Sequence, residues 1–500
     1  MHDFIKYLLK LCHTLKQGEE FMRTTINFRV LSSDEVYEIH MATMEVLERV
    51  GVRVLEENAL QILKEAGADT DPEKKIAKIP EYLIMEAIKK APSSFCLFGR
   101  NKKYKLKLGG KRVYFSMQGT AVHVLDLETS ERRESTLNDL KNFCRLADAL
   151  ENIHHASITV KARDVPENVA HAYELFEAFK NTTKTVDGYN YGRNFAMDTI
   201  RLASIVAGGE EELMKKPMLL GFYNPVSPLQ QSKDLLEGLM VYAKYKQPVL
   251  VAPEAQAGAT APITLAGLLT QQNAEVLSAI TIAELTNPGT PVLYGTVSAP
   301  LDMKTGNIAL GAIEVGLINV ATAQLARYYG LPSRGIGGTT DSKIPDIQAG
   351  LEKAATLLMA ASAGINFIYD AAGALESTLT ASFEQAVIDN ELCGMVARAL
   401  RGIDIDDETL AIDVIENVGP GGQYLSQKHT LKHLKKEQYI PKIIKREKRE
   451  DWERAGSKDL WKVAREEAKK ILKEHQPEPL DKDIEKELKR TIKEIEKRKV

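Results

Sequence analysis

The sequence predicts an α/β protein built on a TIM-type (β/α)8 barrel, with N-terminal helical and small β additions and a charged C-terminal helical tail. Two observations lead to this fold class. Apolar, β-branched runs alternate with helical patterns along the middle of the chain, which is typical of parallel βαβ units. The chain also has 500 residues, 44% of them hydrophobic, which is enough to bury a large core.

The N-terminal part is expected to form a layer before the barrel. Residues 31–67 carry apolar residues every three or four positions, and Ser33 or Asp34 can serve as the N-cap of the first helix. Residues 93–126 alternate in short runs around Gly-Gly and Gln-Gly turns, which predicts a small antiparallel sheet. We therefore expect an N-terminal extension over 1–30 and a helical layer with a small sheet over 31–130.

The barrel is expected over residues 131–427. Seven apolar runs predict its strands, and an eighth strand from the VYFS run (113–116) or from near residue 400 would close it. The seven runs are ASITV (156–160), KTVDGY (184–189), MLLGFYNP (218–225), PVLVAPEAQA (248–257), PVLYGTVSAP (291–300), LPSRGIGG (331–338) and INFIYDAAG (365–373).

The remaining residues, 428–500, predict a charged helical segment. They hold 24 Lys and Arg against 16 Asp and Glu, a net charge of +8. In residues 481–500 both signs are mixed at helical spacing and no aromatic residues are interleaved to stack bases, which favours a solvated helix face over a nucleic-acid site.

Composition indicates a soluble, cytoplasmic protein. The first residues lack a secretory pattern, and no run reaches the roughly 18 apolar residues that a membrane span needs. The four cysteines are scattered without a CxxC pair, as in a reducing compartment. Whether residues 1–21 belong to the native protein stays open, because Met22 is a second candidate start.

Polar and aromatic residues follow the predicted strands at their C-terminal ends. In a parallel barrel these ends share one face, and that face is where such folds hold their sites. Loop exposure alone would explain one or two such residues but explains the whole set less well. The candidates at these strand ends are Asp187, Tyr189, Tyr223, Asn224, Glu254, Gln256, Tyr294, Ser298, Asp370 and Glu376.

The turn GIGGTTDSKIP (335–345) is the most unusual of these strand ends. Its glycines allow a backbone to approach a ligand closely, and Pro345 suits the first turn of the next helix. Asp341 and Lys343 are therefore expected at the mouth of the barrel, either as a loop ion pair or beside a pocket. The turn matches neither the dinucleotide fingerprint nor the phosphate loop.

Several longer segments resemble the trimethylamine methyltransferase family, whose enzymes pass a methyl group from an amine to the cobalt of a separate corrinoid protein. The resemblance covers about residues 30–485 and includes HMATMEVLERVGVRV, IPEYLIMEAIKKAPSSFCLFGR, NAEVLSAITIAELTNPG, SAPLDMKTGNIALGAIEVGLINVATAQLARYYGLPSRGIGGTTDSKIPDIQAGLEKA, FEQAVIDNELCGMV and GSKDLWKVAREEAKKILKEHQPEPLD. It implies a TIM-type barrel, in agreement with the strand pattern.

The resemblance also exposes a departure. The trimethylamine enzymes of the family carry pyrrolysine just before the DSK-like turn, and that position corresponds here to Thr339. Members without pyrrolysine resemble methyltransferases of glycine betaine and related quaternary amines. A quaternary nitrogen already carries the charge that makes its amine a good leaving group, so positioning and electrostatics suffice and no protein nucleophile is needed.

The resemblance thus predicts a quaternary-amine substrate, a corrinoid carried by a cognate partner protein and no tightly bound cofactor or metal. Aromatic faces and carboxylates would hold the ammonium group, and a cation would hold a betaine carboxylate. We predict Asp341 and Lys343 as catalytic residues. The predicted substrate-binding residues are Asp187, Tyr189, Tyr223, Glu254, Tyr294, Arg334 and Thr339.

Other interpretations stay open from the sequence. Lys343 could form a Schiff base in a barrel lyase or aldolase, although Asp341 beside it would keep it protonated. The protein could also bind a betaine, or act as a scaffold, without catalysis, or act on another methylated amine. His429 and His433 lie one helical turn apart but lack a third metal ligand nearby. Residues 418–427 suit a lid, a docking loop or a linker. The particular betaine is unassigned, and a homo-oligomer is possible.

Overall fold

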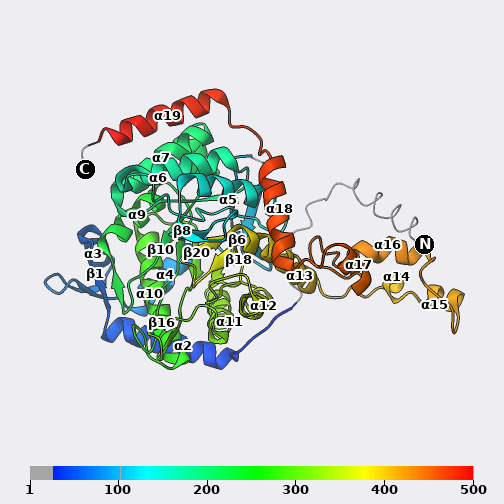
Figure 1. Cartoon of the computed structure of the whole chain (residues 1–500). Helices are drawn as coiled ribbons and strands as arrows, with labels where there is room; N and C mark the ends of the chain where they lie inside the picture. The colour runs from blue at the N-terminus through cyan, green and yellow to red at the C-terminus, as the bar shows by residue number, and fades with distance from the viewer. Residues whose placement is uncertain (1–25, 102, 499–500) are drawn as a thin grey trace.

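The computed structural model of the chain describes residues 26–101 and 103–498, and its centre is a parallel barrel (Figure 1). Seven strands are hydrogen-bonded in the order β6-β18-β17-β14-β12-β10-β9. They are β6 (Tyr114–Met117), β9 (Val186–Gly188), β10 (Leu219–Tyr223), β12 (Val249–Val251), β14 (Val292–Gly295), β17 (Ser333–Ile336) and β18 (Phe367–Ala372).

An irregular segment around His155 closes the barrel. His155 makes a parallel bridge to Ser116 of β6 and another to Thr185 next to β9, so it fills the eighth position of the wall. The ASITV run (156–160) was expected as a regular strand and is not one, because Ser157 takes a left-handed φ of +60° that interrupts the extended backbone. The VYFS run is confirmed as β6, whereas a closing strand near residue 400 is wrong, since that region is helical.

Helices surround the barrel as its outer layer. They are α5 (Leu137–Ala149), α6 (Glu167–Asn181), α7 (Gly192–Ala207), α8 (Glu210–Lys215), α9 (Lys233–Lys244), α10 (Leu265–Thr286), α11 (Ile313–Tyr328), α12 (Ile347–Ser362) and α13 (Phe383–Leu400). Helix α10 is buried on almost every side, because the barrel lies under it and the N-terminal layer covers it. The (β/α)8 fold class is therefore correct.

The N-terminal layer contains helices and a small sheet that includes β11 (Gln230–Gln231). Its other elements are α2 (Ser33–Arg49), β1 (Val52–Val54), α3 (Glu57–Glu65), β2 (Asp69–Asp71), β3 (Ile76–Lys78) and α4 (Glu81–Lys90). The N-cap of α2 is Ser32, not Ser33 or Asp34. Ser32 and Glu35 form a capping box in which each side chain accepts from the other's backbone N–H, and a cap at Ser33 would put Val36 in the partner position.

A hairpin closes the N-terminal end of the barrel. Strands β4 (Phe95–Phe98) and β5 (Lys105–Leu108) pair antiparallel, as predicted. Leu97 and Leu106 pack with Leu220 and Leu250 inside the barrel, and the Phe98 N–H donates to Pro217 just before β10. The hairpin is thus the floor of the barrel.

The rest of the predicted small sheet is divided among other structures. Its VYFS run belongs to the barrel wall, and its last run is β7 (His123–Leu125), which pairs with β8 (Arg132–Glu134) and β20 (Thr380–Ser382). The prediction of a single sheet over 93–126 is therefore wrong, because two of its runs pair with strands far along the chain.

Short strands also lie at the end of the barrel opposite the floor. They are β13 (Gln256–Ala257), β15 (Ala299–Asp302), β16 (Asn307–Ile308) and β19 (Ala374–Leu375).

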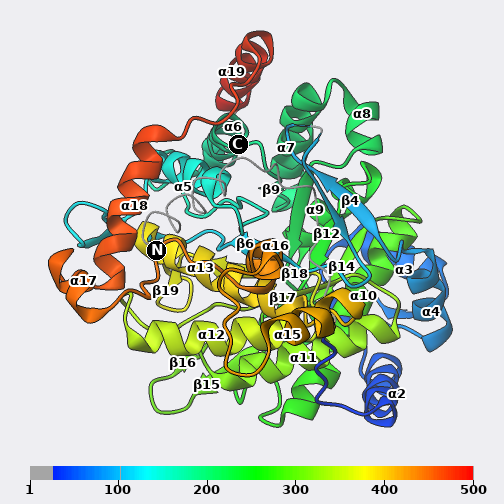
Figure 2. The same ribbon diagram turned by 90° about the vertical axis from the view of Figure 1, so that its right-hand side faces the viewer.

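The C-terminal segment partly wraps the barrel and partly projects from it (Figures 1 and 2). Helix α18 (Leu460–Glu474) packs on α13 and α5, and α19 (Lys482–Glu496) packs on α6 and α7. The preceding helices are α14 (Asp407–Leu410), α15 (Ile412–Val418), α16 (Lys428–Glu437) and α17 (Arg449–Arg454). Within the described residues no helix is long and apolar enough to cross a membrane. The four-segment division of the chain stays a prediction, and most of 1–30 lies outside the described residues.

Candidate active site in the barrel lumen

A pocket of about 300 Å³ lies at the C-terminal ends of the barrel strands, the end opposite the floor hairpin. This volume is at the lower end of the range for small-molecule sites. The residues of its wall that carry the chemistry are Asp187, Asn190, Phe222, Arg334, Tyr369 and Asp370.

Asp187 from β9 is the most heavily hydrogen-bonded group in the pocket. Its Oδ1 lies 2.8 Å from His155 Nε2, and its Oδ2 accepts from the Ser157 hydroxyl at 2.7 Å, the Ile158 N–H at 3.0 Å and the Tyr369 hydroxyl at 2.7 Å. Burial alone would raise its pKa, but His155 and the donated hydrogen bonds hold the pKa below its ordinary value. Asp187 is therefore a fixed anion at neutral pH.

The irregular segment at the eighth position of the barrel wall donates hydrogen bonds to the Asp187 carboxylate. Because Ser157 has a left-handed backbone conformation, its hydroxyl and the N–H of Ile158 both point at Asp187 instead of extending a strand ladder. The backbone conformation that interrupts the wall thus supplies donors to the site.

Aromatic rings flank a buried arginine in the same space. Phe222 and Tyr369 meet edge to face, with ring centroids 4.8 Å apart. The Arg334 guanidinium carbon lies 5.1 Å from the Tyr369 ring centroid and 5.9 Å from that of Phe222. Such rings attract cations through their negative faces, so this wall suits a positively charged group.

Arg334 and Asp370 face each other across the pocket. Arg334 Nη2 lies 4.0 Å from Asp370 Oδ2, and Arg334 Nη1 donates to the Thr296 carbonyl at 2.7 Å. Burial raises the pKa of Asp370 to about 6, and the charge of Arg334 opposes that rise. Burial likewise lowers the pKa of Arg334, against the attraction of Asp370. An arginine remains protonated at neutral pH, so the pocket holds a permanent cation beside a carboxyl that titrates near neutrality.

Two buried donors in the pocket have no hydrogen-bond partner within the described part of the chain. One is Arg334 Nε and the other is Asn190 Nδ2. Asn190 is held in place because its Oδ1 accepts from the Phe222 N–H at 3.1 Å. Unpaired buried donors are costly. Asn190 Nδ2 lies on the side of β10 that faces Tyr242 of α9, whereas the Arg334 guanidinium lies beside the pocket rings, so Arg334 is the donor that an anionic ligand group would satisfy.

Tyr189 and Glu254 were both predicted to bind substrate. Tyr189 lines the pocket, and its hydroxyl donates to the Glu174 carboxylate outside it. Glu254 is solvent-exposed just after β12 and is not part of the pocket wall. Partial desolvation raises the pKa of Glu254, while the charge of Arg334 lowers it, so Glu254 and Arg334 lie within electrostatic reach of each other. The roles of Tyr189 and Glu254 as substrate ligands stay a prediction.

Tyr223 and Tyr294, also predicted to bind substrate, lie on the outer face of the barrel wall. The Tyr223 hydroxyl donates to Gln231 at 2.6 Å, and the Tyr294 hydroxyl donates to Asn273 of α10 at 2.8 Å. Both side chains are fully buried between strands and helices and are absent from the pocket wall. The structure therefore separates them from Asp187 and Arg334.

The turn after β17 also lies outside the pocket wall. Thr339 is fully buried and donates to the Leu310 carbonyl at 2.6 Å. Asp341 accepts from the Ser377 hydroxyl at 2.6 Å and from the Gly311 N–H at 3.2 Å. The exposed Lys343 donates to the Asp341 backbone carbonyl at 2.7 Å, so the two side chains do not pair. The catalytic role of Asp341 and Lys343 stays a prediction that this geometry does not support.

Phe222, Tyr369 and Asn190 were missed by the sequence reasoning. Strand alternation could have indicated that Phe222 faces the side opposite Tyr223. It could not have indicated Tyr369, because Tyr369 and Asp370 both line the pocket and the positive φ of Asp370, 62°, interrupts the alternation there. Asn190 belongs to the loop after β9 and had no comparable signal.

The two histidines of α16 do not form a metal centre. His429 and His433 stack with ring centroids 4.3 Å apart, and His433 Nε2 lies 3.1 Å from Glu408 Oε1. Among the described residues no group of three or more His, Cys, Asp or Glu side chains is arranged to hold a metal ion.

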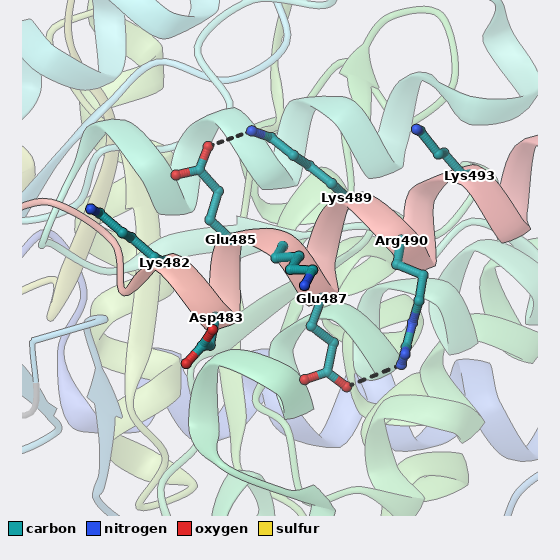
Figure 3. A pocket seen from close by; sticks show the side chains of 8 residues that line it. Lys482, Asp483, Glu485, Glu487, Lys489, Arg490 and Lys493 are labelled. Atoms are coloured by element: carbon teal, nitrogen blue, oxygen red, sulfur yellow. Dashed lines mark hydrogen bonds and ion pairs between the residues drawn. The ribbon is translucent and has the colours of Figure 1, made fainter.

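A second hollow lies on the surface along α19 (Figure 3). Its lining side chains all come from that one helix, and they pair along it, Glu485 with Lys489 and Glu487 with Arg490. Exposed pairs of this kind contribute little energy, and the hollow has neither an aromatic ring nor a buried charge in its lining. The lumen pocket is therefore the candidate active site.

Comparisons with known proteins agree with the sequence pattern. The family model described as trimethylamine methyltransferase (MTTB) matches residues 11–500, which extends the motif-based resemblance at both ends. The chain is 41% identical over 466 residues to the trimethylamine methyltransferase MttB of Desulfitobacterium hafniense, covering 93% of each chain. It is 38% identical over 464 residues to the glycine betaine methyltransferase of D. hafniense strain Y51, covering 92% and 96%.

A more distant similarity was found to a solved structure. The monomethylamine methyltransferase of Methanosarcina barkeri superimposes with a TM-score of 0.47 at 13% identity, covering 94% of this chain and 97% of that one.

Proposed function

Because the chain belongs to the trimethylamine methyltransferase family, we propose that it moves a methyl group from a quaternary amine, glycine betaine or a related betaine, to the Co(I) of a cognate corrinoid protein. The observation that carries the proposal is one pocket that combines aromatic faces, two carboxyl groups and a buried arginine. A betaine has a cationic end and an anionic end, and this pocket offers complementary groups for both.

The ammonium end fits the ring side of the pocket. A fully methylated nitrogen has no N–H to donate, so it is held by ring faces and by nearby negative charge rather than by hydrogen bonds. Phe222 and Tyr369 supply the rings, and Asp187 supplies a fixed anion that its own hydrogen bonds keep charged.

The carboxylate end fits the arginine side of the pocket. Arg334 Nε is buried without a hydrogen-bond partner among the described residues, and a charge-assisted contact from the Arg334 guanidinium would fix the orientation of the substrate. A simple tetraalkylammonium ion would leave Arg334 Nε unpaired and is expected to bind less tightly.

The corrinoid of the partner protein supplies the reduced cobalt that accepts the methyl group. The chain's own residues then have to hold the substrate and keep its methyl groups directed toward the open end of the pocket. Tyr191 and Thr120 line the pocket and are solvent-exposed, so the pocket reaches the surface, which suits access by a partner. We also propose a cytoplasmic location, which suits the free cysteines Cys96, Cys144 and Cys393.

A substrate panel tests the proposal. The purified protein is mixed with a reduced corrinoid protein and, in separate reactions, with glycine betaine, proline betaine, carnitine, tetramethylammonium or trimethylamine. We expect the absorbance change of corrinoid methylation with at least one betaine and little or none with tetramethylammonium, the matched cation without a carboxylate.

The other outcomes each contradict the proposal in a different way. Turnover of trimethylamine alone would assign the activity for which several relatives are named. Betaine binding by calorimetry without methylation would indicate a binding protein. No binding and no turnover across the panel would contradict a quaternary-amine site.

A further inference from the structure

Residues 403–440, here called the arm, project from the barrel and expose an unusual number of large apolar side chains (Figures 1 and 2). None of the residues of α14, α15 and α16 is buried. The exposed apolar residues of the arm are Ile403, Ile405, Leu410, Ile412, Ile415, Tyr424, Leu425, Leu431 and Ile440, with Ile403 exposed by 82% and Ile412 by 69%.

Several charged residues of the arm, by contrast, are paired with one another. Glu408 contacts both Lys432 and His433, and Lys436 lies 2.8 Å from Asp404. The three helices have 4, 7 and 10 residues, and helices shorter than about 12 residues are marginal in water without packing. The arm thus exposes large apolar side chains while several of its charged side chains are paired, which is typical of a protein–protein interface.

Helix α12 carries a second exposed apolar surface, here called the α12 strip. It consists of Ile347, Leu351 and Leu358 of the helix and Ile344 just before it, and Ile347 is exposed by 81%. The two charged residues of α12 point elsewhere: Glu352 accepts from the Asp341 N–H, and Lys353 is buried against Asp389. The outer face of α12 is therefore uncharged in a chain with 27% charged residues.

The arm and the α12 strip lie on the same flank of the barrel. Figure 1 shows the arm leaving the barrel on the side where α12 and α13 lie, and in Figure 2 this flank faces the viewer. Arg398 of α13 anchors the base of the arm through the Glu437 carbonyl and carboxylate. Two apolar surfaces on one flank are the arrangement that a two-fold partner covers simultaneously.

We propose that the arm packs on the α12 strip of a second copy of this chain, while the second copy's arm packs on the first copy's strip. Side chains of this size carry on the order of 100 Å² of apolar surface each, so the two surfaces supply much of the roughly 800 Å² that each partner buries in a stable interface. A second copy is the fitting occupant because each chain carries both halves of the contact, and homodimer interfaces are the more apolar class.

The test compares three variants of the full chain by light scattering after gel filtration. Ile412→Asp/Ile415→Asp changes the arm, and Ile347→Asp/Leu351→Asp changes the α12 strip. Ile263→Asp is the matched control, since Ile263 is 61% exposed just before α10 and outside both surfaces. We expect the wild type and the control to form dimers or larger assemblies of dimers, and each surface variant to dissociate at least tenfold more readily.

Mixing the two surface variants provides the decisive measurement. The arm variant keeps an intact strip and the strip variant keeps an intact arm, so the mixture can form one native contact per pair and should recover dimers that neither variant forms alone. Circular dichroism of each variant checks that the barrel is folded. A Cys pair, Ile412→Cys on one tagged copy and Leu351→Cys on another, should cross-link between the copies.

Three results would overturn the proposal. They are a monomeric wild type at every concentration reached, an oligomer that survives the arm variant, and a mixture that stays monomeric while both variants are folded. Capture of the corrinoid protein by the arm of a monomeric wild type would assign the surface to that partner instead. None of these measurements uses methyl transfer, so their outcome is independent of the proposed function.

Discussion

The two faces of the barrel wall use similar residues for different purposes. Tyr294 on the outer face is fully buried, and its hydroxyl donates to Asn273 of a surrounding helix. Tyr369 on the inner face lines the pocket, and its hydroxyl donates to the Asp187 carboxylate. The outer tyrosine joins strand to helix, whereas the inner one orders a charged site. In this barrel, the face of the wall on which a side chain lies therefore indicates its role better than its residue type does.

The largest expected effect comes from Arg334, the cation of the pocket wall. Replacing Arg334 by Met removes the donor proposed for the betaine carboxylate and should lower kcat/KM for a betaine by about 100-fold, since a hydrogen bond to a charged group contributes roughly 3 kcal/mol. Steady-state corrinoid methylation measures this. Arg334→Lys, which keeps the charge but loses the planar fork, should lose less activity. An equal loss for tetramethylammonium would contradict a role in carboxylate binding.

The next effect is the contribution of Asp370 to the pH dependence of the free energy of unfolding. Burial raises its folded pKa to about 6 from an ordinary value of 3.8, so the folded state holds this proton more tightly than the unfolded chain. The resulting stability is fully present below about pH 4 and is lost as the pH rises through 6, by about 3 kcal/mol for a shift of two units. Urea unfolding of the wild type and Asp370→Asn across this range measures the difference.

Asp187 provides the internal contrast for that experiment. Its folded pKa is lowered, so its contribution to stability is present above the ordinary carboxyl pKa and is lost as the pH falls through the lower folded pKa. If the difference between wild type and Asp370→Asn were flat between pH 4 and pH 7, the assignment of Asp370 as the neutral-range carboxyl would be wrong.

A smaller effect distinguishes the two tyrosines directly. Tyr294→Phe removes one neutral hydrogen bond and should lower the free energy of unfolding by about 1 kcal/mol while leaving kcat/KM unchanged. Tyr369→Phe removes a donor from Asp187 and should lower kcat/KM as well as stability. Chemical unfolding and corrinoid methylation on both variants measure the two quantities. Equal kinetic losses in both would remove the distinction between the two faces.

The smallest effect is expected at the turn after β17. Lys343 is exposed and donates only to a backbone carbonyl, so Lys343→Ala should change kcat/KM less than about twofold and the free energy of unfolding by less than about 0.5 kcal/mol. A loss of 100-fold would instead support the catalytic role predicted from the sequence. Lys304→Ala, another exposed turn lysine, is the matched control.

The sequence was sufficient for the barrel and for part of its site. Strand and helix alternation predicted the wall, and strand ends predicted Asp187, Tyr189 and Arg334, which do line the pocket. The sequence did not show which side chains of a strand point into the barrel and which point outward. Strands such as β12 and β14 are buried on both sides and show no polar alternation. With no exposed face to fix the register, Tyr223 and Tyr294 could not be assigned to the outer side.

Other features depend on tertiary contacts that local patterns do not encode. The composition of the closing segment around His155 predicts a strand. In the structure Ser157 instead adopts a left-handed backbone conformation, and its hydroxyl donates to the Asp187 carboxylate. The orientation of the Asn190 carboxamide likewise depends on a neighbouring strand, because its Oδ1 accepts from the Phe222 N–H of β10.

The floor hairpin has a kinetic consequence. Leu97 and Leu106 pack into the lower lumen and close that end of the barrel. Under the proposed function, the amine and the corrinoid protein therefore both approach the pocket from its open end. The proposed function then predicts a compulsory order, in which the amine binds before the corrinoid protein and the demethylated product leaves after the corrinoid protein has dissociated.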